Sequence, residues 1–155
     1  MRAVIQRVKE ASVAVDGKTI GQCESGYLIF LGVGHTDTEE ICQKLWNKIW
    51  KMRICADNAG KTNLSLKDIE GQALIISQFT LYANSRKGNR PSFTEAAPAQ
   101  KGRELYEKFL DCASRDCCHV EHGEFGADMQ VSLVNDGPFT IVLDTDELFG
   151  PKDNK

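Results

Sequence analysis

The chain has 155 residues, a hydrophobic content of 41%, a charged content of 26% and a formal net charge of −3. These values are ordinary for a soluble globular protein, and the negative charge argues against a general attraction to nucleic acid. The longest apolar run, Tyr27–Val33, is too short to span a membrane, and the N-terminus turns polar too soon for a signal peptide. We expect a cytoplasmic protein with one domain over residues 1–150 and a polar tail over 151–155.

The first part of the chain predicts strands and then a helix. Apolar and β-branched patterns predict four strands: Ala3–Val8, Ser12–Val15, Thr19–Cys23 and Tyr27–Val33. The last of these is continuously apolar, which is typical of a strand buried on both faces. Thr36 followed by Glu39 predicts a capping box at the start of a helix. The apolar stripe of this helix is formed by Ile41, Leu45, Ile49 and Met52.

The middle of the chain predicts a strand, a loop and a second helix. We expect short strands over Arg53–Ala56 and Val120–His122 and a longer one over Ala73–Tyr82. A loop over Ala83–Ala97 follows, and Pro98 opens the second helix. The apolar side of this helix consists of Leu105, Phe109 and Ala113.

Two strand-like segments near the C-terminus, Met129–Val134 and Phe139–Leu143, flank an unusual junction. Asp136-Gly137 is a favoured hairpin turn, but Pro138 follows it. Proline removes an N–H group at the start of a strand and makes a cis peptide bond accessible. The junction is therefore either a turn device or a rigid recognition element. Many strands with two helices predict an α/β or α+β domain with an antiparallel portion.

The predicted strand Ala73–Tyr82 carries polar residues on both of its faces. Such an exception to strand patterning is expected at a functional site, and equally in an edge strand that meets water. No familiar hydrolase or nucleotide-binding motif is present, and the histidines are remote in sequence from Thr80. A threonine without a base is a poor nucleophile, so an enzyme of this kind would position a reactive substrate with backbone donors.

Six cysteines occur without a secretory signal, which favours reduced thiols. A metal site is the alternative, because several cysteines and histidines are close in sequence: Cys112, Cys117, Cys118, His119 and His122. The spacing contains no C-x-x-C pair, so we expect no metal and no other cofactor.

Positive charge is concentrated between residues 83 and 102, where Glu95 is the only acid. The basic residues are Arg86, Lys87, Arg90 and Lys101. A focal basic patch on an acidic protein fits a nucleic acid gripped at one place. Charge alone fits a solvated loop equally well.

Two segments, Ser77–Leu81 and Asn135–Thr140, resemble the signature motifs of the D-aminoacyl-tRNA deacylases. Three further matches occur in family order: Met1–Val8, Lys87–Phe93 and Phe125–Met129. The resemblance covers nearly the whole chain, and the first motif is that of the D-specific class. It implies a single domain with a curved mixed or antiparallel sheet and two main helices, which assembles as a homodimer. It also implies hydrolysis of the ester of D-aminoacyl-tRNA, with glycyl-tRNA as a second candidate substrate.

The resemblance assigns the catalytic roles mainly to the first motif. The backbone N–H groups of Phe79 and Thr80 would stabilise the oxyanion, while Ser77 and Gln78 would line the adenosine end of the pocket. Thr80 is a candidate nucleophile, and the tRNA 2′-OH is the rival for proton handling. The missing base favours the 2′-OH.

The resemblance assigns substrate selection to a cis Gly137-Pro138 element that enters the pocket of the partner subunit. Its two carbonyls would accept hydrogen bonds from the substrate α-ammonium, and an L-residue would be excluded sterically. Met129 would form a pocket wall, and Arg7 would support the partner's Gly-Pro element. The predicted tRNA-binding residues are Arg86, Lys87 and Arg90.

One residue departs from the family pattern, since Phe139 stands where the family usually has valine. Two other functions stay open at this stage. One is a catalytically inactive nucleic-acid-binding module that uses the Arg86–Arg90 patch. The other is a metal-dependent hydrolase that uses the cluster of Cys117, Cys118, His119 and His122.

Overall fold

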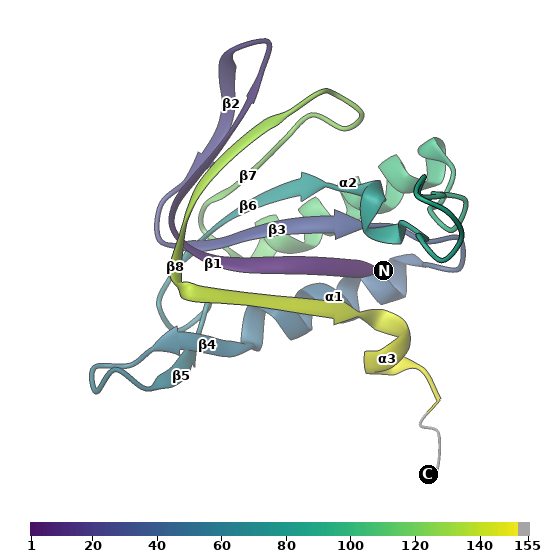
Figure 1. The fold of residues 1–155 in the computed structure, drawn as a ribbon. Helices are drawn as coiled ribbons and strands as arrows, with labels where there is room; N and C mark the ends of the chain where they lie inside the picture. The colour runs from purple at the N-terminus through teal and green to yellow at the C-terminus, as the bar shows by residue number, and fades with distance from the viewer. Residues whose placement is uncertain (152–155) are drawn as a thin grey trace.

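The structure is a computed structural model and describes residues 1–151. It contains one curved six-stranded sheet, with two long helices on one face, and a separate two-stranded hairpin (Figure 1). The strands are β1 (Arg2–Val15), β2 (Lys18–Cys23), β3 (Gly26–Gly32), β4 (Arg53–Ala56), β5 (Thr62–Ser65), β6 (Gln72–Ser77), β7 (Val120–His122) and β8 (Gln130–Asp144). The helices are α1 (Glu39–Lys51), α2 (Ala99–Asp116), the short α3 (Thr145–Phe149) and the 3-10 helix η1 (Phe79–Tyr82).

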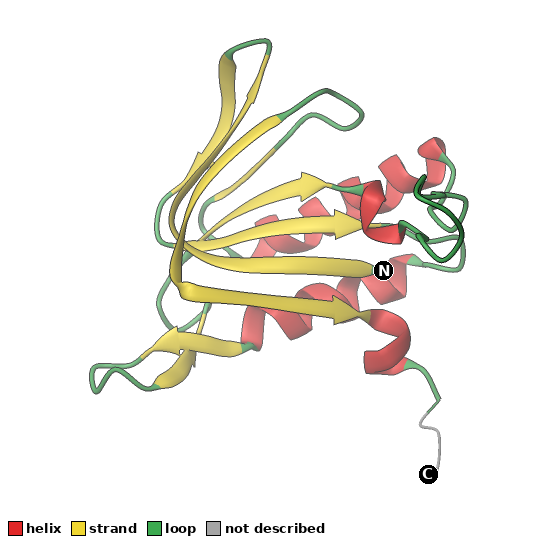
Figure 2. Cartoon of the chain, viewed as in Figure 1, coloured by secondary structure: helices red, strands yellow, loops and turns green. Residues whose placement is uncertain are grey.

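The predicted fold class is confirmed, because a mixed, curved sheet packs against two main helices. Figure 2 shows α1 and α2 side by side behind the sheet. The predicted domain boundary at residue 150 stays a prediction, since residues 152–155 of the predicted tail lie outside the described part. Within residues 1–151, no helix is both long enough and apolar enough to cross a membrane.

Strand β1 connects the two halves of the sheet. Its first half pairs with β3, its second half pairs with β2, and β8 pairs along nearly its whole length, all antiparallel. The two strands predicted over Ala3–Val8 and Ser12–Val15 are therefore one strand. Register shifts beside Val8 let the strand bend, and this bend curves the sheet.

The two predicted C-terminal strands are also one strand, β8, so they are not separate strands and the turn alternative for their junction is wrong. Gln6 pairs with Thr140 and Val8 pairs with Asn135, so four residues of β8 stand opposite Arg7 alone. Both halves of β8 pair with β1 rather than with each other. The Gly137-Pro138 junction consequently bulges out of a continuous strand.

Strands β3 and β6 pair in parallel in the middle of the sheet, and β3 is the buried strand that the apolar run over Tyr27–Val33 predicts. Tyr27, Leu28 and Ile29 are each fully buried. One face packs against α1 and α2, where Trp46 meets Phe109 edge-on with ring centroids 5.8 Å apart. This packing fixes the carboxyl ends of β3 and β6 relative to the start of α2.

Helix α1 begins two residues later than the predicted capping box implies. Thr38, not Thr36, is the N-cap, and its hydroxyl accepts a hydrogen bond from the N–H of Ile41. The reason is Asp37, whose buried carboxylate accepts from the N–H of Gly34 at 2.6 Å and so closes the preceding turn. Strand β5 and helix α3 were not predicted, because both are too short for a periodic pattern.

The Asp37 carboxylate also accepts hydrogen bonds from the Met1 ammonium, at 2.5 Å, and from the Tyr82 hydroxyl, at 3.5 Å. We expect Asp37→Ala to lower the free energy of unfolding by about 3–5 kcal/mol, because the substitution leaves a buried ammonium unpaired. Urea denaturation measures the loss. Glu40→Ala, which removes the exposed pair with Lys44, is the control and should shift the midpoint little. Equal small shifts for both variants would contradict the role given to Asp37.

Candidate active site

A cleft of about 580 Å³ lies where the carboxyl ends of β3 and β6 meet the start of α2. The ends of parallel strands are a usual place for a ligand site. The lining is mainly apolar, and Asp128 is its single charged residue. Its other members are Leu31, Val33, Ile76, Ser77, Gln78, Phe79, Phe93, Ala96, Ala97, Ala99, Gly102, Phe125, Gly126, Ala127, Met129 and Val131. Such a cleft suits a ligand with a variable apolar part.

The first motif leaves the sheet at the cleft. Strand β6 ends at Ser77, and Phe79–Tyr82 form the 3-10 helix η1, so the strand predicted over Ala73–Tyr82 is five residues too long. The predicted alternation of faces fails beyond Ser77 for the same reason. Within residues 1–151, the backbone N–H groups of Phe79 and Thr80 donate no hydrogen bond. The first N–H groups of any helix lack internal partners, so η1 supplies free donors beside the cleft.

Thr80 follows the cleft-lining residues Ser77, Gln78 and Phe79 but does not itself line the cleft. Its exposed hydroxyl accepts a hydrogen bond from the side-chain amide of Gln78 at 2.5 Å. In the described part of the chain, no histidine or carboxylate hydrogen-bonds this hydroxyl. The arrangement orients the hydroxyl without activating it as a nucleophile.

Met129 forms part of the cleft wall, and its role in substrate binding stays a prediction. Gly123 allows its position, because a Cβ atom at Gly123 would lie 2.4 Å from the Met129 sulfur. The same added atom would lie 3.3 Å from the Cδ1 of Ile76. Any larger residue at position 123 would therefore displace Met129 and change the shape of the cleft.

Two aromatic residues that line the cleft, Phe93 and Phe125, were not predicted as site residues. Phe79 and Phe93 meet at 73°, with centroids 5.3 Å apart, and Phe79 is 57% exposed. Phe125 lies on another wall, with the Arg103 guanidinium 4.8 Å from its ring centroid. Adjacent exposed aromatic rings form an apolar patch of the kind that marks a ligand-binding surface. Phe93 stands within a family-like segment, which was the available signal.

The Gly137-Pro138 peptide bond is cis, in agreement with the sequence-based expectation. Asn135 closes the bulge around it, because its side-chain oxygen accepts from the N–H of Phe139 at 2.7 Å and its amide donates to the Phe139 carbonyl at 3.1 Å. Gly137 and Pro138 are both exposed. The bulge thus presents a backbone element with no long side chain.

Arg7 supports the bulge from the facing strand. Its Nε donates to the Asp136 carbonyl at 3.0 Å, and its Nη1 donates to the Ile54 carbonyl at 2.6 Å. The Phe139 ring lies against the guanidinium, 4.7 Å from its carbon to the ring centroid. Arg7 therefore holds the bulge of its own chain, and Phe139 has a packing role. Support of the partner's bulge by Arg7 stays a prediction.

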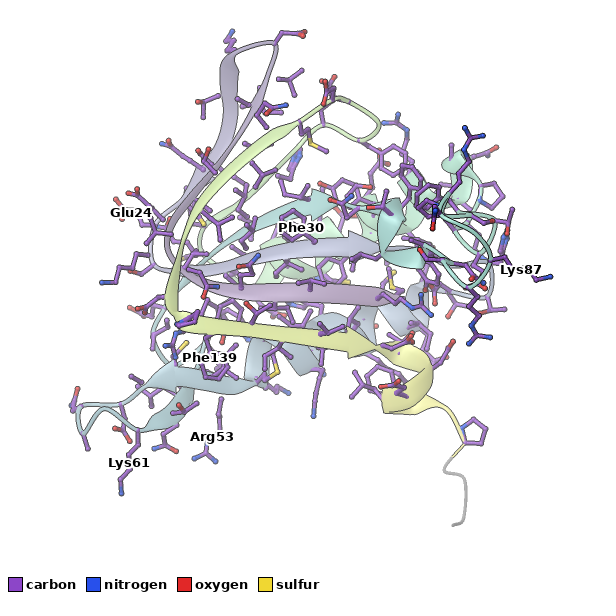
Figure 3. All side chains as sticks on the ribbon, viewed as in Figure 1. Glu24, Phe30, Arg53, Lys61, Lys87 and Phe139 are labelled. Carbon is purple, nitrogen blue, oxygen red and sulfur yellow. The ribbon has the colours of Figure 1, made fainter. Side chains whose placement is uncertain are left out.

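Within one chain, the predicted site residues fall into two groups. Ser77, Gln78, Phe79 and Met129 meet at the cleft, whereas Gly137, Pro138 and Arg7 do not line it. The bend of β8 lies at the opposite end of the sheet from η1 (Figure 1). The basic residues Arg86, Lys87 and Arg90 are exposed in the loop that carries Phe93. Figure 3 shows Phe139 beside the β8 bend and Lys87 at the far edge of the molecule.

The cysteines and histidines between residues 112 and 122 do not come together as a metal site. The buried Cys117 thiol donates to the Gly71 carbonyl, and burial raises the pKa of Cys117, which keeps it protonated. The His119 and His122 rings contact the carbonyls of Gln22 and Gly123, respectively. Across residues 1–151, no three groups of the metal-binding types come together. The metal-dependent alternative is therefore not favoured.

The curved sheet, with an apolar cleft and backbone donors at the carboxyl ends of its parallel strands, defines a class of small α/β proteins. A solved structure of this class, described as the c-Myc DNA Unwinding Element Binding Protein, is similar with a TM-score of 0.88 and 37% identity over 93% of this chain and 98% of that one. The family profile described as D-Tyr-tRNA(Tyr) deacylase matches residues 4–144. The chain belongs to this D-Tyr-tRNA(Tyr) deacylase family.

Curated relatives agree with this assignment. A D-aminoacyl-tRNA deacylase of Thermotoga petrophila is 55% identical over 149 residues, which are 96% of this chain and 100% of the relative. A D-aminoacyl-tRNA deacylase of Lactobacillus acidophilus is 56% identical over 144 residues, which are 93% of this chain and 99% of the relative. The similarity therefore extends over the whole sheet and both long helices.

Arg7→Lys tests the support of the bulge. A lysine ammonium cannot span two carbonyls and stack on a ring as a planar guanidinium does. We expect the free energy of unfolding to fall by about 1.5–3 kcal/mol, because charged hydrogen bonds are lost. We also expect faster hydrogen exchange at the backbone amides of residues 135–137 and 139. Arg115→Lys on α2 is the control. Unchanged exchange in the bulge would show that Arg7 does not hold it.

Proposed function

We propose that this protein hydrolyses the ester bond between a D-amino acid and the terminal adenosine of tRNA, releasing the free D-amino acid and tRNA. The observation that carries the proposal is the pair of unbonded N–H groups at Phe79 and Thr80, placed beside an apolar cleft in a member of this family. An aminoacyl ester is already reactive. Positioning and oxyanion stabilisation therefore suffice for its hydrolysis.

In the proposed reaction, water attacks the ester carbonyl and negative charge develops on the carbonyl oxygen. The free N–H groups of η1 donate to that oxygen, so they act more strongly on the transition state than on the substrate. Removal of one such donor from an enzyme typically costs on the order of 10²–10³ in kcat. Ser77 and Gln78, on the same wall, face the adenosine end of the substrate.

Thr80 orients rather than attacks in this proposal. Its oxygen already accepts from Gln78, and no base is positioned to take its proton. The vicinal 2′-OH of the terminal adenosine lies next to the ester in every substrate. It can transfer the proton from water to the leaving oxygen, which completes the proton balance without a protein base.

Selection for D-amino acids requires a second subunit in this proposal. Gly137 and Pro138 do not reach the cleft of their own chain, so we place them in the cleft of the partner in a homodimer. Their carbonyls would accept hydrogen bonds from the substrate α-ammonium. The substrate side chain would then point along the apolar wall near Met129, while an L-residue would collide with the backbone of the bulge.

The basic loop is assigned to tRNA. Arg86, Lys87 and Arg90 are exposed on the loop that carries Phe93, so they can meet phosphates next to a bound terminal adenosine. The Phe79 and Phe93 rings offer a stacking surface at the same rim. The proposed substrate also implies a cytoplasmic protein, because aminoacyl-tRNA is used there.

The direct test compares D-tyrosyl-tRNA and L-tyrosyl-tRNA as substrates of the purified protein. We expect hydrolysis of the D-ester and little hydrolysis of the L-ester above the spontaneous rate, because the bulge excludes the L-configuration. Release of radiolabelled tyrosine measures both rates. Equal rates on the two esters would refute chiral selection, and tRNA binding without turnover would favour the inactive binding module.

Thr80→Ala tests the proton route. We expect kcat/KM to stay within about tenfold of the unmodified protein, since only orientation is lost, whereas loss of a covalent nucleophile costs on the order of 10⁴-fold or more. Thr80→Ser keeps a hydroxyl and serves as the control. A D-tyrosyl-tRNA ending in 2′-deoxyadenosine should be a poor substrate for all three proteins. Full loss with Thr80→Ala in a folded protein, rescued by Thr80→Ser, would assign the nucleophile to Thr80.

A further inference from the structure

A second basic region lies outside the family-like motifs, at the end of α1 and on the β4–β5 hairpin. Between residues 44 and 67 the sequence has six basic residues and one acid, Asp57. All six basic side chains belong to exposed residues. We define the basic hairpin surface by five of them: Lys48, Lys51, Arg53, Lys61 and Lys67.

Little negative charge neutralises this surface. Lys44 is excluded because it pairs with Glu40 at 2.6 Å, whereas no ion pair within residues 1–151 involves the five residues of the surface. The Asp57 carboxylate accepts from the N–H groups of Ala59 and Lys61 in its own turn. Asp68 lies near Lys67 and Arg53, which help to lower its pKa after its hydrogen bonds to Ser65. Lys48, Lys51 and Lys61 can therefore form ion pairs with a negatively charged partner.

The basic hairpin surface lies beside the Gly137-Pro138 bulge. The Arg7 guanidinium donates to Ile54 of β4 and to Asp136 at the start of the bulge, so one side chain joins the two elements. Figure 3 shows Arg53 and Lys61 on the same side of the molecule as Phe139, while Lys87 lies at the opposite edge. The two basic regions therefore lie at opposite edges of one chain (Figure 3).

We propose that the basic hairpin surface of one subunit binds the sugar-phosphate backbone of the tRNA whose acceptor end lies in the partner's cleft. The inference rests on the proposed function, in which the bulge of one subunit enters the partner's cleft. The β4–β5 hairpin beside that bulge then lies next to the same cleft. Each RNA end then meets the Arg86–Arg90 loop from one subunit and the hairpin from the other. Exposed lysines suit phosphate contacts, which position the RNA without reading its sequence.

The test removes two charges from the surface with Lys51→Gln and Lys61→Gln combined. Lys18→Gln with Arg115→Gln removes two exposed basic charges elsewhere and is the matched control. The binding constant K for tRNA that carries no amino acid is measured at a series of salt concentrations. Each lost phosphate contact lowers the slope of log K against log salt by about 1, so we expect a decrease of about 2 for the hairpin variant and none for the control. Identical slopes for all proteins would overturn the proposal.

Kinetics separate RNA contacts from the chemistry of the cleft. For the hairpin variant, we expect kcat/KM on D-tyrosyl-tRNA to fall on the order of tenfold relative to kcat/KM on D-tyrosyl-adenosine, which lacks the RNA backbone. An unchanged ratio would overturn the proposal. If the proposed function itself is wrong, the unmodified protein hydrolyses neither ester, while the salt slopes still test the surface.

Mixed dimers test the action across subunits. In one subunit, Ala127→Trp fills the cleft and the hairpin is unmodified. In the other subunit, the cleft is open and the hairpin carries the Lys51→Gln and Lys61→Gln substitutions. The single open cleft then faces an unmodified hairpin, so its KM for D-tyrosyl-tRNA should equal that of the unmodified protein. A KM as high as that of the hairpin-variant homodimer would show action within one subunit. A protein that is monomeric at the assay concentration would overturn the cross-subunit arrangement.

Discussion

The guanidinium of Arg7 holds three parts of the chain together where β1, β4 and β8 meet. It donates to one carbonyl of β4 and one of the bulge, and the Phe139 ring covers its face. The side chain is only 16% exposed, so its charge must be satisfied locally. Because the Asn135 side chain closes the same bulge, the Gly137-Pro138 element is fixed before any ligand arrives. A fixed element loses little conformational entropy on binding.

The cleft likewise presents backbone groups that the fold holds in place before a ligand binds. Its donors are backbone N–H groups, freed because β6 stops at Ser77 and the chain turns into η1. Its walls are mostly apolar, and its one charged residue is exposed. Backbone groups held by a packed sheet are preorganised and independent of side-chain conformation. This arrangement suits a substrate whose reactive group is constant and whose side chain varies.

Local patterns predicted the elements whose packing is also local. The apolar run over Tyr27–Val33 indicated a buried central strand, and the stripes of α1 and α2 indicated their buried faces. The errors occurred where distant residues decide the local structure. The Asp37 carboxylate accepts hydrogen bonds from Met1 and Gly34, which makes Thr38 the N-cap of α1. The facing strand β1 keeps both halves of β8 in one strand although Gly137 and Pro138 interrupt it.

The sequence by itself determined the α/β class, the buried strand and both long helices, because hydrophobic periodicity reports which face of an element is covered. Its two motifs also indicated the family, including the residues at the cleft and in the bulge. Only the tertiary structure decided that these two motifs lie at opposite ends of the sheet within one subunit (Figure 1). It also decided that Phe139 packs on Arg7 and that β6 ends at Ser77. Those features depend on contacts between residues far apart in sequence, such as the 129 positions that separate Arg7 from Asp136. No local pattern encodes such contacts, since they form only when the sheet brings the strands together.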